Sequence, residues 1–145
     1  MIESKTVKET APQVVLGHHV TILIAEDDRG HYLLTKNYLH EVGVRNKILW
    51  FEDGQAILDF LESEHYQREG QRYILLLDIR MPKVDGMEVL EKIKQNSAFD
   101  NIFVIMLTTS EDQEQARCCY TLGCDAHIIK PPGPVLLRAM QRAGR

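Results

Sequence analysis

The sequence predicts an open, doubly wound α/β domain built on a sheet of five parallel strands. Its length of 145 residues suits one domain of ordinary size. Short apolar runs, rich in β-branched residues, alternate with stretches of helical periodicity. The runs around residues 75 and 105 are continuously apolar, as parallel strands covered on both faces are. Five strand–helix units are too few for an eightfold barrel, so we expect the sheet to stay open.

The five predicted strands begin 26, 26, 29 and 24 residues apart along the chain. This spacing leaves room for a helix and two short loops between successive strands, which is the connection that parallel strands require. In order, the runs are TILIA from Thr21, KILWF from Lys47, YILLL from Tyr73, IFVIML from Ile102 and AHII from Ala126.

Each segment after a strand carries an apolar stripe at helical spacing, which predicts a helix packed on the sheet. In the first segment Leu34, Tyr38 and Val42 recur at every fourth position, and Gly43 supplies a C-terminal stop. The last helix is short, and Pro134 suits its first turn. The other stripes are Ile57, Phe60 and Leu61; Val89, Leu90 and Ile93; Ala116, Cys119, Tyr120 and Gly123; and Val135, Leu136 and Met140.

Composition argues against several classes of protein. The net charge is −4, whereas a protein that grips nucleic-acid backbone usually has a basic face. No apolar run approaches the roughly 20 residues that span a bilayer, and the N-terminus lacks the apolar core of a secretory signal. Cys118, Cys119 and Cys124 lack metal-ligand spacing, so we expect reduced, buried thiols in a cytoplasmic protein.

The chain divides into two parts by composition. Residues 1–19 are polar and aperiodic, which predicts an N-terminal tail or a short extra helix. Residues 20–145 carry all five strand–helix units and form the predicted domain.

Acidic residues follow the first and third predicted strands, and they converge if the sheet has the flavodoxin-like order 2-1-3-4-5. In that order these two strands are neighbours at the point where such sheets bind ligands. Glu26 and Asp27 follow the first strand and Asp78 ends the third, so we expect the three carboxylates to share one depression. Like charges so close raise one another's pKa, and a divalent cation relieves the repulsion. Hard oxygen ligands, with water in the remaining positions, suit Mg²⁺.

Thr108 and Lys130 end the fourth and fifth predicted strands at the same edge of the sheet. A carboxylate beside a cation can attack a phosphoryl group to give an acyl phosphate, while a lysine and a hydroxyl neutralise charge on the phosphoryl oxygens. Each residue alone also has a structural explanation, since acidic residues at strand ends often cap the next helix, as Asp28 is placed to do. The coincidence of carboxylates, hydroxyl and lysine at successive strand ends favours phosphoryl chemistry.

The chain resembles the receiver domain of two-component response regulators, the family of the bacterial chemotaxis regulator. The resemblance covers roughly residues 20–143 and is carried by ILIAEDD, LLLDIRMPKVDG, IMLTTS and IIKP, in the family's order and spacing. It implies that Asp78 is the phosphoacceptor. It also implies that Mg²⁺ is held by Glu26, Asp27, Asp78 and the backbone carbonyl of Arg80, with Asp27 a direct ligand and Glu26 acting largely through water.

The resemblance also implies which residues respond to phosphorylation. Thr108 matches the hydroxyl that moves toward the phosphoryl group, and Lys130 matches the lysine that pairs with a phosphoryl oxygen. Lys130–Pro131 is similar to the family's cis peptide. In the loop after the acceptor, Pro82 fixes the backbone and Gly86 permits a turn that other residues resist.

Two positions depart from the family's pattern. His127 stands where the family usually has a tyrosine or phenylalanine whose ring changes side as the threonine moves. Either this histidine swings likewise and makes the switch sensitive to pH, or it is a half-buried residue with a satisfied hydrogen bond. Thr109 stands where the family often has alanine or glycine, and we expect its bulk to narrow access to Asp78. The remaining histidines have no ligand spacing and are expected at the surface: His18, His19, His31, His40 and His65.

The resemblance implies a phosphorylation-controlled signalling switch rather than an enzyme. A sensor histidine kinase would phosphorylate Asp78, and Thr108 and His127 would then alter the surface of the fourth predicted helix, the fifth strand and the last helix. That surface would bind a downstream protein or a second copy of the chain; neither nucleic acid nor membrane is an expected partner. The segments IKQNSAFDN, LTTSED and SEHYQREGQR resemble the stand-alone regulators that include partners of cyanobacterial phytochromes, which makes a phytochrome a candidate kinase.

Three other functions fit parts of the pattern. A receiver-like scaffold that acts without phosphorylation predicts the same fold. A haloacid-dehalogenase-like phosphatase also uses an aspartyl phosphate and Mg²⁺, but it has a second acid two residues after the nucleophile, where this chain has Arg80. A flavodoxin-like FMN carrier needs a Ser/Thr/Gly-rich loop after the first strand, where Glu26, Asp27 and Asp28 would repel phosphate.

Overall fold

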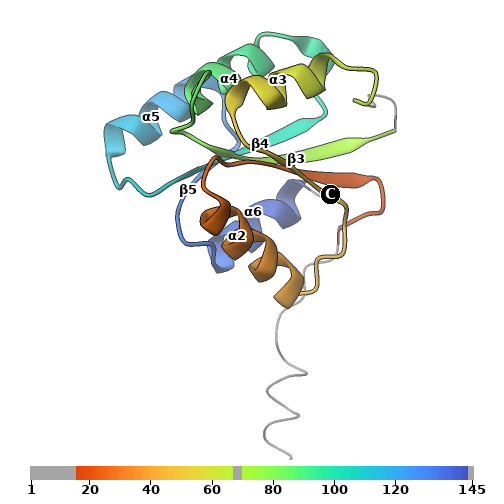
Figure 1. Ribbon diagram of the computed structural model, residues 1–145. Helices are drawn as coiled ribbons and strands as arrows, with labels where there is room; N and C mark the ends of the chain where they lie inside the picture. The colour runs from red at the N-terminus through yellow and green to blue at the C-terminus, as the bar shows by residue number, and fades with distance from the viewer. Residues whose placement is uncertain (1–15, 67–69, 144–145) are drawn as a thin grey trace, which may run out of the picture.

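Five parallel strands form one sheet with the order β2-β1-β3-β4-β5 in the computed structural model, as the sequence predicts (Figure 1). The structure describes residues 16–66 and 70–143. At the end of β1, Ala25 lies opposite Phe51 of β2 and Leu77 of β3. The carboxyl ends of the first and third strands are therefore neighbours at one edge of the sheet.

Strands and helices alternate along the chain. The strands are β1 (Val20–Ala25), β2 (Ile48–Phe51), β3 (Arg72–Asp78), β4 (Ile102–Thr108) and β5 (Ala126–Ile129). The helices are α2 (Arg29–Glu41), α3 (Gly54–Glu62), α4 (Gly86–Lys94), α5 (Gln113–Leu122) and α6 (Pro134–Ala143), with a short 3-10 turn, η1 (Ser97–Phe99), before β4. Most of the predicted tail, residues 1–15, lies outside the described residues, so the division at residue 19 stays a prediction.

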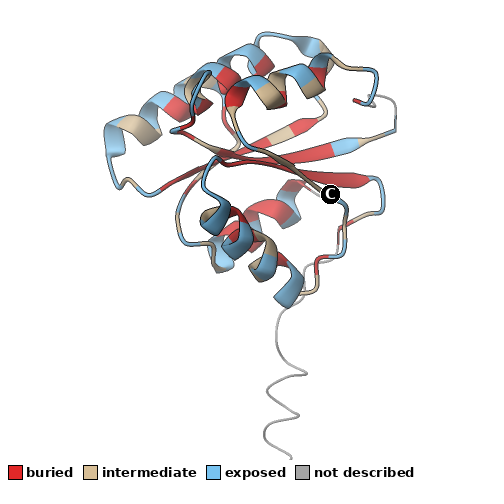
Figure 2. Ribbon diagram, in the orientation of Figure 1, coloured by how far each residue is buried: buried red, intermediate tan, exposed pale blue. Residues whose placement is uncertain are grey.

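Helices cover both faces of the sheet, with α2 and α6 on one face and α3, α4 and α5 on the other (Figure 1). Because side chains alternate along a strand, β1 contributes Ile22 and Ile24 to one hydrophobic cluster and Leu23 and Ala25 to the other. Figure 2 shows buried residues along the sheet and on the inner faces of the helices, with exposed residues outside. Burial on both faces explains why the strands are continuously apolar in sequence. Within the part of the chain that the structure describes, no helix is both long and apolar enough to cross a bilayer.

Aspartate side chains fix the starts of four helices. Each accepts a hydrogen bond from a backbone N–H in the first helical turn, which satisfies one of the donors that a helix start leaves unpaired. These residues are Asp28, Asp53, Asp85 and Asp112. The predicted stop at Gly43 is confirmed, since this glycine follows α2 with a φ of 96°.

The apolar stripe predicted for the first helix is partly wrong. Leu34 is 59% exposed, and α2 instead buries Tyr32, Thr35 and Leu39. Apolar residues recur at helical spacing on two faces of this helix, so periodicity alone does not decide which face meets the sheet. The exposed leucine leaves an apolar position near the start of α2.

Two of the later stripes are also wrong in part. Tyr120 of α5 and Val135 of α6 are exposed rather than buried. The cysteine prediction holds for Cys119 and Cys124, which are buried thiols, but Cys118 is exposed. The side chains turned outward lie on the two helices that flank β5.

Candidate functional site

Three carboxylates meet where β1 and β3 end. Glu26 and Asp27 directly follow β1, Asp78 is the last residue of β3, and one oxygen from each side chain lies within 4.8 Å of the others. Glu26 is buried, Asp27 is exposed and Asp78 is mostly buried. The structure thus brings together the acidic residues that the sequence places in one depression. Their hard oxygen donors fit a divalent cation such as Mg²⁺.

The environment of Asp78 raises the pKa of its carboxyl to about 7. Burial is the largest cause, followed by the hydrogen bond with Glu26 and the negative charge of that residue. The Lys130 ammonium acts in the opposite direction. Without a cation, Asp78 therefore stays protonated to a higher pH than an ordinary aspartate, and a bound cation would favour the ionised, nucleophilic form.

Lys130 closes the depression from the end of β5. Its Nζ donates to Glu26 Oε1 and lies 3.6 Å from Asp78 Oδ1, and only 8% of its side chain is exposed. Its backbone N–H donates to the Thr108 carbonyl at 2.7 Å, and the Lys130–Pro131 peptide bond is cis. The ammonium therefore faces the Asp78 carboxyl from a buried position.

Thr108 and Thr109 line another side of the depression. Thr108 is buried, and its Oγ1 accepts a hydrogen bond of 3.0 Å from the Ser110 N–H. Thr109 is exposed and borders the same depression as the acidic residues and Lys130. The hydroxyl of Thr108 is thus held by its own loop, while Thr109 stands at the rim.

The loop from Asp78 to α4 returns close to its own start. The Gly86 N–H donates to the Ile79 carbonyl at 2.8 Å, and a Cβ on Gly86 would lie 2.2 Å from the Asp78 carbonyl oxygen. Glycine is therefore needed here for space, and the non-glycine residue with positive φ in this loop is Lys83, at 70°. Arg80 borders the depression from this loop.

His127 lies on β5 outside the residues that line the depression. It pairs with Met106 of β4, and its N–H donates to the Tyr120 hydroxyl at 3.1 Å. Its Nε2 is buried with no hydrogen-bond partner among the described residues, and burial lowers the pKa of the ring. His127 is half-buried, and both alternatives, a pH-sensitive switch and a structural histidine with a satisfied hydrogen bond, stay predictions.

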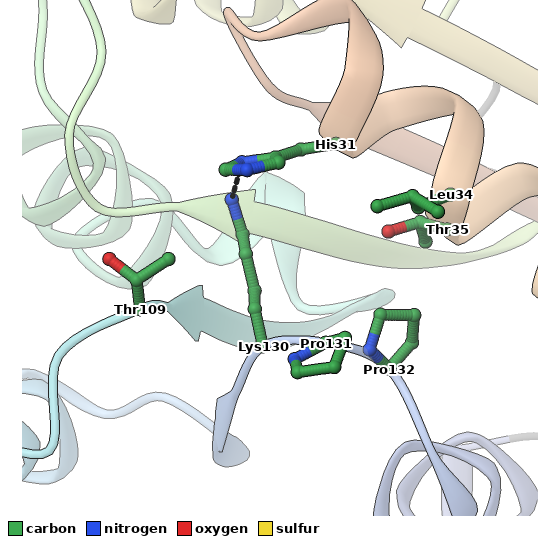
Figure 3. A pocket seen from close by; sticks show the side chains of 7 residues that line it. All are labelled: His31, Leu34, Thr35, Thr109, Lys130, Pro131 and Pro132. Carbon is green, nitrogen blue, oxygen red and sulfur yellow. Dashed lines mark hydrogen bonds between the residues drawn. The ribbon is translucent and has the colours of Figure 1, made fainter.

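One histidine that we expected at the surface, His31, is partly exposed and also borders the site. The Nδ1 of His31 is 3.2 Å from Lys130 Nζ and 3.9 Å from Glu26 Oε1, although 41% of the side chain is exposed (Figure 3). Asp28 accepts a hydrogen bond of 3.0 Å from the His31 N–H, which fixes this helical turn. The available signal in the sequence was position, since His31 lies in the first turn of the helix that follows the acidic pair.

The sequence between residues 22 and 142 matches the family described as response regulator receiver domain. The probable methanogenesis regulatory protein FilR2 of Methanothrix harundinacea is 36% identical over 110 residues, which are 76% of this chain and 71% of that protein. Response regulator Rcp1 of Synechocystis sp. is 32% identical over 110 residues, which are 75% of each protein.

Solved structures show the same relationship. The bacteriophytochrome response regulator AtBRR superposes with a TM-score of 0.73 at 31% identity, covering 88% of this chain and 94% of that one. The Mn²⁺-bound form of Rcp1 superposes with a TM-score of 0.67 at 30% identity, covering 86% and 90%. The resemblance to phytochrome response regulators is therefore confirmed as a similarity in sequence and fold. Strand order, acidic cluster and sequence match agree, and the chain belongs to the response regulator receiver domain family of two-component signalling.

Proposed function

We propose that Asp78 accepts a phosphoryl group from the phosphohistidine of a sensor histidine kinase. A carboxylate oxygen of Asp78 forms the new bond to phosphorus, the phosphorus–nitrogen bond of the donor breaks, and the imidazole leaves with the electron pair. The observation that carries the proposal is the cluster of three carboxylates within 4.8 Å, with Lys130 Nζ 3.6 Å from Asp78. The chain would act as a signalling protein whose only catalysis is the gain and loss of its own phosphoryl group.

Glu26, Asp27, Asp78 and the backbone carbonyl of Arg80 would hold Mg²⁺. Glu26 already accepts a hydrogen bond from Lys130, so it would act on the cation largely through water, whereas exposed Asp27 is open to direct coordination. The Mn²⁺-bound form of Rcp1 supports a divalent cation in this chain as well. When bound, the cation offsets charge on the phosphoryl oxygens.

Phosphorylation brings close to two negative charges into the depression, and neighbouring donors then respond. Lys130 pairs with a phosphoryl oxygen, and Thr108 turns its hydroxyl from the Ser110 N–H toward the phosphoryl group, with Thr109 at the rim limiting access. One or two charge-assisted hydrogen bonds, at roughly 1.5–3 kcal/mol each, supply much of the roughly 5.5 kcal/mol that inverts a 1:99 population.

His127 would carry this change to the surface formed by α5, β5 and α6. Thr108 and His127 belong to the same face of the sheet. His127 pairs with Met106 of β4, and Thr108 lies two residues after Met106 on that strand, so the side chains of all three residues share one face. The backbone of His127 is bonded to the hydroxyl of Tyr120, which is 54% exposed. A shift of the His127 backbone that accompanies movement of the ring would therefore reach an exposed aromatic side chain through one hydrogen bond.

The proposed partners follow from this surface and from the family. Tyr120, Ile129 and Val135 are large exposed apolar side chains on α5, β5 and α6, and they suit a downstream protein or a second copy of the chain. The kinase would be a sensor histidine kinase, with a phytochrome the first candidate because AtBRR is a bacteriophytochrome response regulator. We propose a cytoplasmic location, where the three free thiols would stay reduced, and a receiver domain of residues 20–145.

Labelling by acetyl phosphate in the presence of Mg²⁺ tests the proposal. The wild-type chain is expected to gain one phosphoryl group and Asp78→Asn none. Asp59→Asn is the matched control and should label like the wild type. It removes an exposed carboxylate of α3 that does not line the depression. Labelling of Asp78→Asn at the wild-type rate would refute the assignment. A wild-type chain that neither labels nor binds beryllofluoride with Mg²⁺ would favour the scaffold function.

A further inference from the structure

We infer that His31 is a positioning residue that aims the Lys130 ammonium at the phosphoryl group on Asp78. This inference rests on the proposed function of Asp78. Figure 3 shows the imidazole on α2 and the lysine side chain from the end of β5 meeting head to head. The distance between His31 Nδ1 and Lys130 Nζ is 3.2 Å.

A lysine ammonium has three N–H donors and no acceptor, so we assign His31 Nδ1 as the acceptor, which places the ring proton on Nε2. Glu26 Oε1 takes one donor and His31 takes a second. The nearest Asp78 oxygen, at 3.6 Å, is too distant for a hydrogen bond. The third N–H is therefore available to a phosphoryl oxygen on Asp78, and the two acceptors together orient it.

The backbone that carries the imidazole is held in place before any phosphoryl donor arrives. Asp28 accepts a hydrogen bond from the His31 N–H, and the next residue, Tyr32, stacks on Trp50 of β2 with ring centroids 4.3 Å apart. Trp50 also donates to the backbone carbonyl of Glu26 at 2.8 Å. The first turn of α2 and the acidic pair are thus braced against the same indole. Because this acceptor is already positioned, little conformational entropy is lost at His31 when Asp78 is phosphorylated.

A neutral acceptor suits this position better than a charged one. Three carboxylates already lie together, and a fourth would raise their repulsion and bind Lys130 more tightly in its resting place. The imidazole accepts a hydrogen bond without adding charge. His31 therefore steers Lys130 without strongly competing with the phosphoryl group for it.

Two substitutions at His31 distinguish the effect of its hydrogen-bond acceptor from the effect of its packing. His31→Asn keeps an acceptor at the δ position, His31→Leu keeps bulk without an acceptor, and His40→Ala removes a histidine from the other end of the same helix as a control. With saturating acetyl phosphate and Mg²⁺, His31→Leu is expected to lower the phosphorylation rate about three- to tenfold, the value of one hydrogen bond of ordinary strength. The donor concentration at half-maximal rate should barely change. His31→Asn should stay within about twofold of the wild type, and His40→Ala should match it.

A second readout needs neither cation nor phosphoryl group. In nitrogen NMR spectra of histidine-labelled protein, His31 Nδ1 should be unprotonated, and its resonance should move in Lys130→Ala but not in Lys92→Ala, which removes an exposed lysine of α4. Two results would overturn the inference even while Asp78→Asn still abolishes labelling. One is a His31 resonance that does not move in Lys130→Ala, and the other is a phosphorylation rate lower in His31→Asn than in His31→Leu. If the wild type does not label at all, the proposed function fails, and the spectra alone decide whether the pair exists.

Discussion

The indole N–H of Trp50 donates a hydrogen bond of 2.8 Å to the backbone carbonyl of Glu26. Trp50 lies on β2, an edge strand of the sheet, so this bond ties the edge to the acidic pair at the neighbouring strand end. The chain has one tryptophan. Its fluorescence is therefore expected to report events at the carboxylate cluster without an introduced probe.

Titration with Mg²⁺ should change Trp50 emission in a saturable manner. Asp27→Asn removes a charged ligand, and we expect the half-saturating concentration to rise about tenfold or more, which corresponds to about 1.4 kcal/mol of binding free energy. Asp28→Asn keeps the helix cap and removes a neighbouring charge outside the cluster, so its midpoint should shift far less. An Asp27→Asn curve that overlays the wild-type curve would contradict the role of this carboxylate.

The raised pKa of Asp78 makes folding stability depend on pH. The pKa is about 7 in the folded chain against an ordinary value of 3.8, so between these values the folded state binds more protons than the unfolded state. The contribution of this group to the free energy of unfolding is thus largest below pH 3.8, declines up to about 7 and is constant above.

Asp78→Asn should remove that dependence. Without Mg²⁺, we expect the variant to exceed the wild type in unfolding free energy by on the order of 1–3 kcal/mol at about pH 8, with the advantage shrinking at about pH 5. Urea denaturation at both pH values measures the difference, with Asp59→Asn as the control. Identical pH dependence in the wild type and Asp78→Asn would show that another group titrates.

Gly86→Ala should disturb the loop that carries the acceptor. An added Cβ would lie 2.2 Å from the Asp78 carbonyl oxygen and 2.8 Å from Ile79 Cα, so backbone has to move. We expect a loss of about 1–3 kcal/mol in unfolding free energy, the usual cost of overpacking, together with weaker Mg²⁺ binding. Gly133→Ala is the control, because among the described residues no atom beyond its chain neighbours lies within 4 Å of the added Cβ. Equal free energies of unfolding for the two variants would mean that the loop accommodates the added Cβ without loss of stability.

The acidic cluster was predictable because two simple rules suffice for it. Alternating strand and helix patterns give parallel strands, and the strand order 2-1-3-4-5 makes the ends of the first and third strands neighbours. Glu26, Asp27 and Asp78 then meet whatever the details of packing. The resemblance to receivers added chemical roles for these residues, and those roles are the subject of the labelling experiment.

His31 and Gly86 could not be predicted in the same way. The contact between His31 and Lys130 joins residues 99 positions apart and depends on how far two side chains reach across the strand ends. The crowding at Gly86 depends on the return path of one loop, which no spacing in the sequence records. Leu34 shows the same limit for helices, since the choice between two apolar faces is made by the fit against the sheet.

His127 should make stability depend on pH in the opposite direction from Asp78. Burial lowers the pKa of its ring below the ordinary 6.5, so the unfolded state binds more protons once the pH falls below that value. The stability contributed by the neutral ring is therefore fully present above pH 6.5, and it is lost as the pH falls through the pKa of the folded state. His127→Phe should lose less stability than the wild type on acidification, which urea denaturation measures, and His40→Ala should behave like the wild type.

The same substitution decides between a proton-sensitive switch and a plain structural histidine. If the ring turns inward on activation, its burial deepens, and protonation should oppose the active state. The NMR change that beryllofluoride and Mg²⁺ produce at Tyr120, which is bonded to the His127 N–H, should then weaken in the wild type between about pH 7.5 and 5.5. With Mg²⁺ and beryllofluoride at saturating concentrations, the response of His127→Phe should depend on pH less than that of the wild type, because phenylalanine does not titrate and Asp78 still does. A wild-type response that depends on pH no more than the response of His127→Phe would leave His127 with a structural role alone.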